Sequence, residues 1–439
     1  MKQCGIISGI IIIGLLLIFS VLYLLIIKKE NKLFKNQKQI IVLILAISFI
    51  FMLILPYLSS DIYYYMGDSW LLSKYKQNPY YVAVSDLQDQ GINDEILENT
   101  GYWKNTTSIY GPLWNSIAKM LISLSFGSVT VGLFIFKVVS YLIHILNCCL
   151  IYKITKSRKY MLLYGLNPLV LIEFLSNVHN DIYLVLFILL SLYFLIRKKS
   201  IIFTILFLAL SVSIKYSTVL LVPFILIYCF RKKTVPKRIL YCFISGVSII
   251  AFVVLLYMPY YRDMSIFTNM LVQGSKYSQS LLTYILLNGS SNLFEIANFI
   301  VIPLFAIIYI FIIIDILFKP KITLKNILTK YNIAMLLFVF VVLATFQKWY
   351  VLWLLPTIIF QNKNMRRFIL YLTITALIPS IKYFMVEGDP YYYGVSYSIK
   401  MLIISITLVI ISWLINKFLI IYRRNRKNEK NISNRTLLQ

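Results

Sequence analysis

The chain is poor in acidic residues, histidine and cysteine. Its 439 residues include 16 Asp and Glu against 43 Lys and Arg, with two His and five Cys. Each cysteine lies inside or at the edge of an apolar segment, without the spacing of a metal site, so we expect no structural disulfide and no zinc. A Gly-rich phosphate loop and an HExxH motif are also missing, which disfavours nucleotide-driven transport and zinc proteolysis.

Apolar residues, by contrast, are abundant. They make up 60% of the chain, and the mean hydropathy is +0.81. Soluble domains are about half apolar, and many apolar stretches here reach or approach the roughly 20 residues that a helix needs to cross a bilayer. The composition therefore predicts an all-α integral membrane protein. The basic residues fall in short clusters between apolar runs, which indicates membrane topology and not nucleic-acid binding.

The basic clusters predict how the chain crosses the membrane. The first apolar segment is too long for a signal-peptide core and has no small-residue cleavage site, so we expect it to be retained as a helix. A cytoplasmic position for residues 28–38 places the N-terminus and residues 58–112 on the outer face. The later basic clusters then all fall in the cytoplasm, at 153–159, 197–199, 231–238, 319–330, 363–367 and from Arg423.

This topology predicts a polytopic protein of roughly 13 transmembrane helices. One membrane domain covers 1–422, and a basic cytoplasmic tail covers 423–439. In the external region, 58–126, the segment 113–126 is expected to lie along the membrane surface as an amphipathic helix. Several spans have about 14 residues and cover ~21 Å of a ~30 Å core, so we expect their outer ends to open into a water-filled recess. The spans after the external region are predicted at 129–152, 160–176, 181–196, 200–214, 217–230, 239–259, 293–318, 331–346, 350–362, 368–385 and 395–421.

The external region holds seven of the 16 acidic residues, and Asp61 differs from the others in its position. Asp61 follows the second apolar segment, about 39–57, where partial desolvation raises the basicity of a carboxylate. The alternatives are a solvated loop acid or a helix cap. Residues 63–65 are predicted to anchor this stretch in the membrane interface, and residues 78–80 to turn the loop.

A second set of polar residues falls in NPLVLIEFLSNVHND, at 167–181, between two short helices. It contains Glu173, Asn177, His179, Asn180 and Asp181. His179 and Asp181 are candidates for a base or a polar clamp. Asn, His and Asp are also ordinary turn residues, and that alternative stays open.

Lys215 lies at the external end of two short apolar segments, where burying an ammonium group is costly unless an anion meets it. No acid is adjacent in the sequence, so a lipid phosphate is a candidate partner, and the alternative is a side chain that extends into the headgroups. Arg262 with Asp263, and the stretch TFQKWYVLWLLP at 345–356, add cations and aromatic rings to the same outer rim. Trp and Tyr at a membrane surface are usually interface belts.

Five motifs occur in an order that resembles a known family. DIYYYMGD, KQNPYY, IYGPLWNSIAKML, NPLVLIEFLSNVHND and QKWYVLWLLP, with the helix pair around Lys215 between the last two, are similar to the GT-C superfamily of polyprenol-phosphate-sugar-dependent glycosyltransferases. The likeness is strongest to bacterial polyprenol-phosphate-mannose-dependent mannosyltransferases and spans about residues 55–360. The chain departs from many of these relatives in SSD before the first motif and in NVHND.

The resemblance implies an enzyme that transfers a hexose, in the first place mannose, from a polyprenyl monophosphate. The implied acceptor is a lipid-linked or cell-envelope glycan at the outer face, among membrane lipids. An inverting reaction is implied, with no nucleotide sugar, no cofactor and no tightly bound metal. Asp61 matches the position of the general base.

Substrate-binding roles are expected for thirteen further residues: Asp68, Asn78, Tyr80, Tyr110, His179, Asn180, Asp181, Lys215, Arg262, Gln347, Lys348, Trp349 and Tyr350. Lys215, with Arg262 or Lys348, is expected to offset the charge of the phosphate. Asp68 either caps a short helix at 70–76 or contacts the acceptor.

Two other functions remain as alternatives. A polymerase or ligase of lipid-linked glycans usually carries its catalytic Arg and His in a large late loop, whereas the large polar loop of this chain is the first one and is acidic. A non-enzymatic flippase or transporter of lipid-linked sugars is expected to show broken helices in matching halves, and the sequence has no such symmetry.

Overall fold

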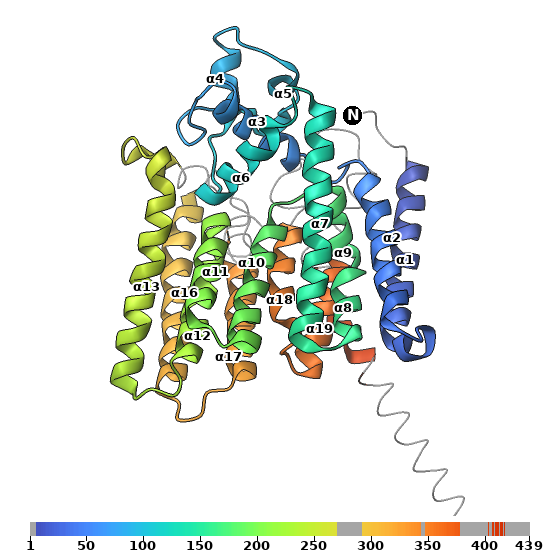
Figure 1. Cartoon of the computed structure of the whole chain (residues 1–439), viewed down its shortest axis with the longest axis vertical. Helices are drawn as coiled ribbons and strands as arrows, with labels where there is room; N and C mark the ends of the chain where they lie inside the picture. Colours follow the sequence, from blue (N-terminus) through green and yellow to red (C-terminus); the bar gives the residue numbers. More distant parts are fainter. Residues whose placement is uncertain are drawn as a thin grey trace, which may run out of the picture.

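The described part of the protein is helical throughout. The computed structural model describes residues 6–269, 292–343 and 347–377, with single positions between 403 and 417, and these residues form helices and no strands. The helices form an upright bundle with a cap over one end (Figure 1). The predicted span at 395–421, the end of the one at 368–385 and the basic tail lie largely or wholly outside the described residues.

Long apolar helices make up the outer parts of the bundle. Among the described residues, four helical stretches are long and apolar enough to cross a membrane: Val129–Thr155, Val235–Tyr260, Phe299–Phe318 and Leu324–Val342. A fifth candidate is a broken pair, Pro168–Ser176 and Asp181–Lys198, bent by 117°. The longer helices are α1 (Ile6–Leu33), α2 (Gln37–Leu53), α7 (Val129–Thr155), α13 (Val235–Tyr257), α16 (Asn292–Phe318) and α17 (Leu324–Leu337).

Shorter helices fill the middle of the bundle. Their residue ranges lie close to those of the short spans predicted from the sequence. A π-helical stretch extends α17 (η6, Phe338–Val342), and a 3-10 turn extends α13 (η5, Met258–Tyr260). The remaining short elements are α8 (Arg158–Gly165), α9 (Pro168–Val170), η2 (Leu171–Ser176), α10 (Asp181–Tyr193), η3 (Phe194–Lys198), α11 (Ile201–Ile214), η4 (Tyr216–Leu221), α12 (Val222–Cys229), η7 (Lys348–Leu354), α18 (Leu355–Ile358) and α19 (Lys363–Thr375).

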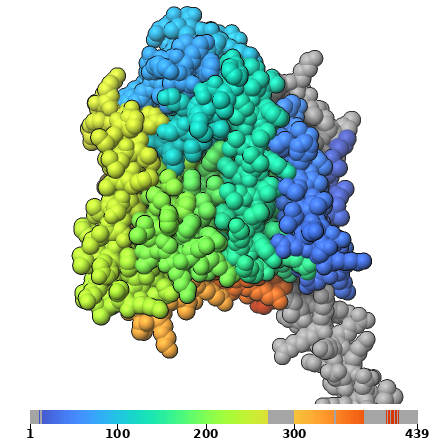
Figure 2. All heavy atoms as spheres, in the orientation of Figure 1, coloured from blue at the N-terminus to red at the C-terminus, as the bar shows by residue number. Residues whose placement is uncertain are grey.

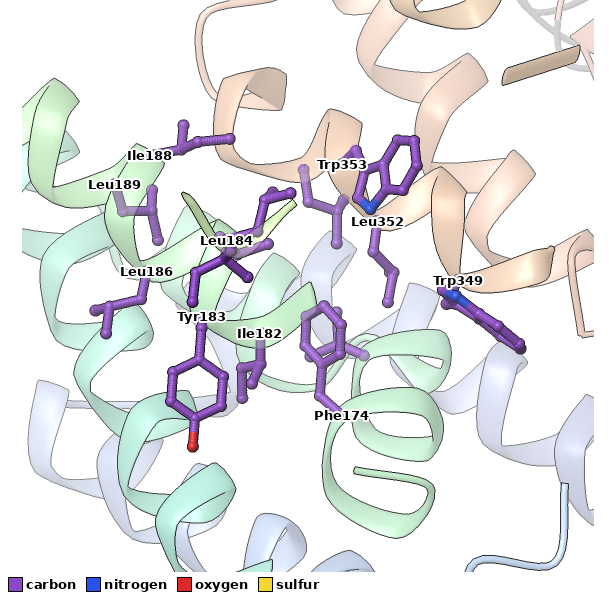
Figure 3. Packing of buried hydrophobic residues seen from close by; sticks show 14 of the residues in the cluster. Phe174, Ile182, Tyr183, Leu184, Leu186, Ile188, Leu189, Trp349, Leu352 and Trp353 are labelled. Atoms are coloured by element: carbon purple, nitrogen blue, oxygen red, sulfur yellow. The ribbon is translucent and has the colours of Figure 1, made fainter. Parts of the chain in front are cut away.

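Helix α10 lies at the centre of the core. It is apolar all round, as expected for a helix without a solvent face, and Ile182, Leu184 and Leu189 are fully or almost fully buried. Figure 3 shows its side chains next to Phe174 of η2 and to the Leu352 and Trp353 side chains of η7. The elements that carry the polar motifs therefore share one apolar core.

The predicted external region forms the cap. It contains α3 (Asp61–Ser73), α4 (Val84–Gln88), α5 (Glu95–Glu98), η1 (Gly101–Asn105) and α6 (Pro112–Ser123). In the space-filling view these residues cover one end of the bundle (Figure 2). Helix α6 confirms a helix near 113–126, and its buried residues Trp114, Ala118 and Leu121 follow one helical face.

Asp94 ties the cap together. Its Oδ1 accepts hydrogen bonds from the first amides of α5, and its Oδ2 accepts from Trp70, Lys74 and Tyr75 at 2.7–2.9 Å. Although partial burial acts in the opposite direction, these donors lower the pKa of Asp94 to about 2. Asp94 is therefore the N-cap residue of α5 with a structural role, and not a freely solvated acid of the external region.

Three predictions for the start of the cap are wrong in detail. Pro56 disfavours helix at Leu55, so α2 ends at Leu53 and Asp61 is the first residue of α3, not the exit of the second apolar helix. Asp68 lies inside α3, so it does not cap a separate helix at 70–76. Tyr64 and Tyr65 are buried against Tyr110, not placed as interface anchors.

Gly111 joins the cap to the bundle. Its amide donates to the Ile214 carbonyl at 3.2 Å, next to Lys215. A Cβ atom at this position would lie 2.1 Å from the Ser213 carbonyl oxygen and 2.6 Å from its carbonyl carbon. Since these are backbone atoms at the end of α11, they cannot move aside as a flexible side chain does. The close approach therefore requires glycine.

We expect Gly111→Ala to lower the midpoint of thermal unfolding of the purified protein in detergent. The added methyl group overpacks the junction, which typically costs about 1–3 kcal/mol. Gly246→Ala is the matched control, because Gly246 lies inside α13 with no atom within 4 Å of its Cβ position. Its midpoint should stay the same or rise. Equal midpoints for both variants would contradict the tight junction.

Candidate active site

A sharp bend between two helices places the central residues. Helix η2 ends at Ser176 and α10 begins at Asp181. Val178 has φ +60°, a left-handed conformation that is unusual for a β-branched residue. The bend turns the chain back, so that the His179 amide donates to the Glu173 carbonyl at 2.9 Å. Such strain is often found at functional sites.

His179 lies between two carboxylates. Its Nδ1 is 3.5 Å from Asp61 Oδ2, and its Nε2 is 3.2 Å from Glu173 Oε2. The imidazole ring stacks on Trp349, with centroids 3.7 Å apart. Glu173 is fully buried, and its Oε1 is 3.2 Å from the Lys348 ammonium. A line of titratable groups thus runs from Asp61 through His179 and Glu173 to Lys348.

The loop that precedes Asp61 is held by the same residues. The Leu58 amide donates to Asn177 Oδ1 at 3.3 Å, and the Leu58 carbonyl accepts from Lys348 at 3.2 Å. Asn177 also donates to Glu173 Oε2 at 2.9 Å. The backbone of the Asp61 loop and the buried carboxylate therefore share their partners.

Asp181 and Lys215 form a second ion pair in the site. The Lys215 ammonium lies 2.9 and 3.1 Å from the two carboxylate oxygens of Asp181, and Trp353 Nε1 donates to the same carboxylate at 2.5 Å. The ammonium also faces the rings of Tyr350 and Trp353, at 5.1 and 5.3 Å from their centroids. Lys215 thus has a protein carboxylate as a partner, which its sequence neighbours did not reveal.

The electrostatic environment connects Asp61 to both ion pairs. Burial raises the pKa of Asp61 above that of an ordinary aspartate. Electrostatic interactions with His179 and Lys215 lower this pKa in part, and the Asp181 carboxylate raises it. Asp61, His179, Asp181 and Lys215 therefore form one electrostatic unit, and the raised pKa makes the Asp61 carboxylate a stronger base than a solvated one.

Asn180 and Asp68 are buried polar residues near this unit. Both polar atoms of the Asn180 carboxamide lack a hydrogen-bond partner among the described residues. The Asp68 carboxylate lies beside the Ser108 and Tyr64 side chains. Burial raises the pKa of Asp68 well above its usual range, although nearby Ser108 and Tyr64 act against this. Buried groups without a protein partner are candidates for contact with a ligand.

Tyrosines connect the cap to the site. The Tyr110 carbonyl accepts from Tyr80 at 2.7 Å and from Tyr216 at 3.3 Å, and the Tyr110 ring packs against Tyr65. Asn78 donates to the Tyr260 carbonyl at 2.6 Å, and residues 78–82 form the predicted turn. Asn78, Tyr80 and Tyr110 therefore belong to the contact between the cap and the bundle. None of the hydrogen bonds described for them involves Asp61.

Arg262 lies apart from the central groups, and the Gln347 side chain forms no hydrogen bond with them among the described residues. Arg262 is exposed, pairs with Asp263 at 3.0 Å and stacks on Tyr81 at 4.7 Å. Gln347 precedes η7, and its carbonyl accepts the Tyr350 amide at 3.0 Å. The structure thus gathers His179, Asp181, Lys215, Lys348, Trp349 and Tyr350 around Asp61, but not these two residues.

Three residues of the site were not among the predicted site residues. Glu173 and Asn177 occur in the motif NPLVLIEFLSNVHND, but their spacing on a regular helix gives no indication that a π-helical stretch aims Glu173 at His179. From the sequence, Trp353 is expected to be an aromatic residue of the membrane interface. Its partner Asp181 is 172 positions away. Among the described residues, no group of His, Cys, Asp and Glu has the arrangement of a metal site.

The sequence matches the family described as alpha-(1->6)-mannopyranosyltransferase, N-terminal domain, over residues 2–231. The match covers more than half of the chain, and the chain belongs to this family. The resemblance to bacterial mannosyltransferases is thereby confirmed, and with the long apolar helices it identifies a membrane mannosyltransferase family. No curated protein and no solved structure matches the chain. The matched region contains Asp61, His179, Asp181 and Lys215, whereas η7 lies beyond it.

We expect Lys348→Met to destabilise the fold strongly, because it removes an ammonium group from a fully buried carboxylate. Breaking one side of a buried pair costs about 3–5 kcal/mol. The double variant Lys348→Met with Glu173→Gln should lose less than the sum of the two single variants, as measured by thermal or denaturant unfolding. The exposed pair provides the control, and Arg262→Gln should leave the unfolding midpoint unchanged. Additive losses would show that Glu173 and Lys348 are not coupled.

Proposed function

We propose that the protein is an inverting glycosyltransferase of the GT-C type, which transfers mannose from a polyprenyl monophosphate to a lipid-linked or cell-envelope glycan. The observation that carries this proposal is the convergence of Asp61, His179, Asp181 and Lys215 in a chain of a mannosyltransferase family. The convergence joins a buried base and an ammonium group, and glycosyl transfer from a lipid phosphate uses both.

The proposed reaction is a single displacement. Asp61 accepts the proton of an acceptor hydroxyl as the hydroxyl oxygen attacks the anomeric carbon, and the bond from that carbon to the phosphate oxygen breaks. The electron pair leaves with the polyprenyl phosphate, and the proton remains on the Asp61–His179 pair. His179 is suited to share this proton, because Glu173 lies on its far side at 3.2 Å. Asn180 and Asp68 are the proposed contacts to the sugar or the acceptor.

Lys215 is the proposed partner of the donor phosphate. Asp181 is fully buried, whereas the Lys215 side chain is 17% exposed, so the ammonium is the accessible side of the pair. An ammonium group has three N–H donors, and the Asp181 oxygens need not use them all. The Lys348 ammonium is engaged with Glu173 and the Leu58 carbonyl, which favours Lys215 over Lys348 for the phosphate.

An apolar groove beside Lys215 fits the isoprenoid chain of such a donor. The groove has a volume of about 720 Å³ and lies between α11, η4 and α13. Its lining includes Val212, Tyr216, Val253 and Tyr257. Tyr216 directly follows Lys215, so a lipid in the groove would bring its phosphate end toward the ammonium. Its chain would gain stability by burial of apolar surface.

For the topology we propose roughly 13 membrane crossings, with the cap and the active site on the extracytoplasmic face of the cell membrane. The support is the charge pattern, because the acidic cap lies at one end of the bundle (Figure 1). The loops 230–234 and 319–323, which contain the first residues of the predicted cytoplasmic clusters 231–238 and 319–330, join helices at the other end. A donor made on the inner face would then act after it has crossed the membrane.

Asp61→Asn should lower mannosyl transfer by about 10²–10⁴-fold, the usual contribution of a general base. The assay supplies labelled polyprenyl-phosphate mannose and an acceptor extract to purified protein, and follows both product and released polyprenyl phosphate. Asp89→Asn is the control, because Asp89 is an exposed acid of the same cap. Undiminished transfer by Asp61→Asn would exclude it as the base. Movement of the intact donor across vesicles without release of polyprenyl phosphate would favour a flippase.

The raised pKa of Asp61 predicts that the rate of mannosyl transfer falls on the acid side of its pH profile, and this fall is the acid limb. A base acts when deprotonated, so transfer should fall as the pH drops through this pKa. The fall should begin above the pH at which an ordinary aspartate is protonated, near 3.9. Asp181→Asn removes a negative charge beside Asp61, so the limb should move to lower pH, whatever the change in maximal rate. A limb that stays in place, or moves to higher pH, would contradict this assignment.

A further inference from the structure

Lys137 is a buried lysine that neither the motifs nor the family resemblance singles out. It lies in α7, two turns after the start of the helix, and is 5% exposed. Its ammonium donates to the carbonyls of Ile54 at 2.6 Å, Ser176 at 2.9 Å and Leu175 at 3.2 Å. Within the described part of the chain, no carboxylate pairs with it. All three donors of the ammonium group are used by the backbone.

The three carbonyls belong to the two segments that carry the reacting pair. Ile54 opens the loop that ends at Asp61, and Leu175 and Ser176 end the helix η2 that precedes His179. Terminal carbonyls of a helix lack intrahelical partners, and a cation is favourable there. Lys137 therefore stabilises the end of η2 and, with the same group, holds the Asp61 loop against it.

Neighbouring hydrogen bonds extend this connection toward the site. The Ser176 hydroxyl lies 3.4 and 3.1 Å from the Ile54 and Leu55 carbonyls. The next residue, Asn177, accepts from the Leu58 amide. The two segments are thus joined at successive points. The hydrogen bonds from Lys137 come from a charged ammonium group, and such bonds are stronger than those between neutral groups.

We propose that Lys137 is a positioning residue for the Asp61–His179 pair. It touches neither residue and acts by fixing the register of the two backbone segments, so that Asp61 and His179 remain at 3.5 Å. Its effect on transfer rests on the proposed function, because it operates through Asp61 as the base. Its effect on the two segments does not depend on any activity.

The test combines hydrogen exchange with kinetics on the full-length protein in detergent. Lys137→Met should speed amide exchange by about tenfold or more in peptides covering 54–60 and 175–180, since three charge-assisted hydrogen bonds are lost. Exchange in α13 and α17 should stay unchanged. Turnover should fall about 10–100-fold with the donor KM within about twofold, because misplacement affects the chemical step more than binding.

Three further variants sharpen the result. Lys137→Arg keeps the cation and should restore most of the turnover, whereas Lys153→Met, at an exposed position of the same helix, should change nothing. Ser176→Ala removes one of the neighbouring bonds and should reproduce the exchange pattern more weakly if Lys137→Met does not fold. In an Asp61→Asn background, Lys137→Met should reduce the residual rate no further.

Unchanged exchange in both segments, or faster exchange across the whole bundle, would overturn the proposal. So would an additive loss of rate in the Asp61→Asn background, because a general structural defect acts independently of the base. If the wild-type protein shows no mannosyl transfer, the proposed function fails, and the exchange pattern alone decides whether Lys137 joins the two segments.

Discussion

The site depends on a carboxylate held inside an apolar core. Glu173 is fully buried next to Phe174 and Leu175, where an isolated charge would be very unfavourable. Its position is tenable because Lys348, His179 and Asn177 all direct polar groups at its two oxygens. Satisfying this one group fixes the ring of His179, the start of η7 and the loop before Asp61. The buried charge thus organises segments from three distant parts of the sequence.

The same requirement explains why the site is accessible at one end. Asp61 retains slight exposure, whereas His179 and Glu173 have none. At the buried end, the Glu173 charge is therefore compensated by protein groups. At the other end, the Asp61 carboxylate remains accessible to a substrate. Lys215 repeats this arrangement, with its buried partner Asp181 behind it and aromatic faces beside it. Both halves of the site present one slightly exposed group in front of a fully buried partner.

Much of the helical layout follows from the sequence, and less of the site does. Apolar runs between basic clusters predict helices at 129–152 and 200–214, within a few residues of α7 and α11, because length and hydropathy determine them. The motif order also singles out Asp61, His179 and Lys215, which lie close together in the structure. The sequence does not predict which polar side chains pair with one another. Lys215 pairs with Asp181, 34 positions away, and Trp353 donates to the same carboxylate. A π-helical stretch and a left-handed valine, which set the direction of Glu173 and His179, leave no composition signal.

The ion pair between Glu173 and Lys348 crosses the end of the matched family region at residue 231. A fragment that stops there would contain the base, the histidine and the buried carboxylate, but not the ammonium that compensates it. The stacking partner of His179 and the indole that donates to Asp181 would be missing as well. The unit that forms the complete site is therefore larger than the matched N-terminal domain. Side chains of η7 and of the NVHND bend are in direct contact, although 172 positions separate Trp353 from Asp181.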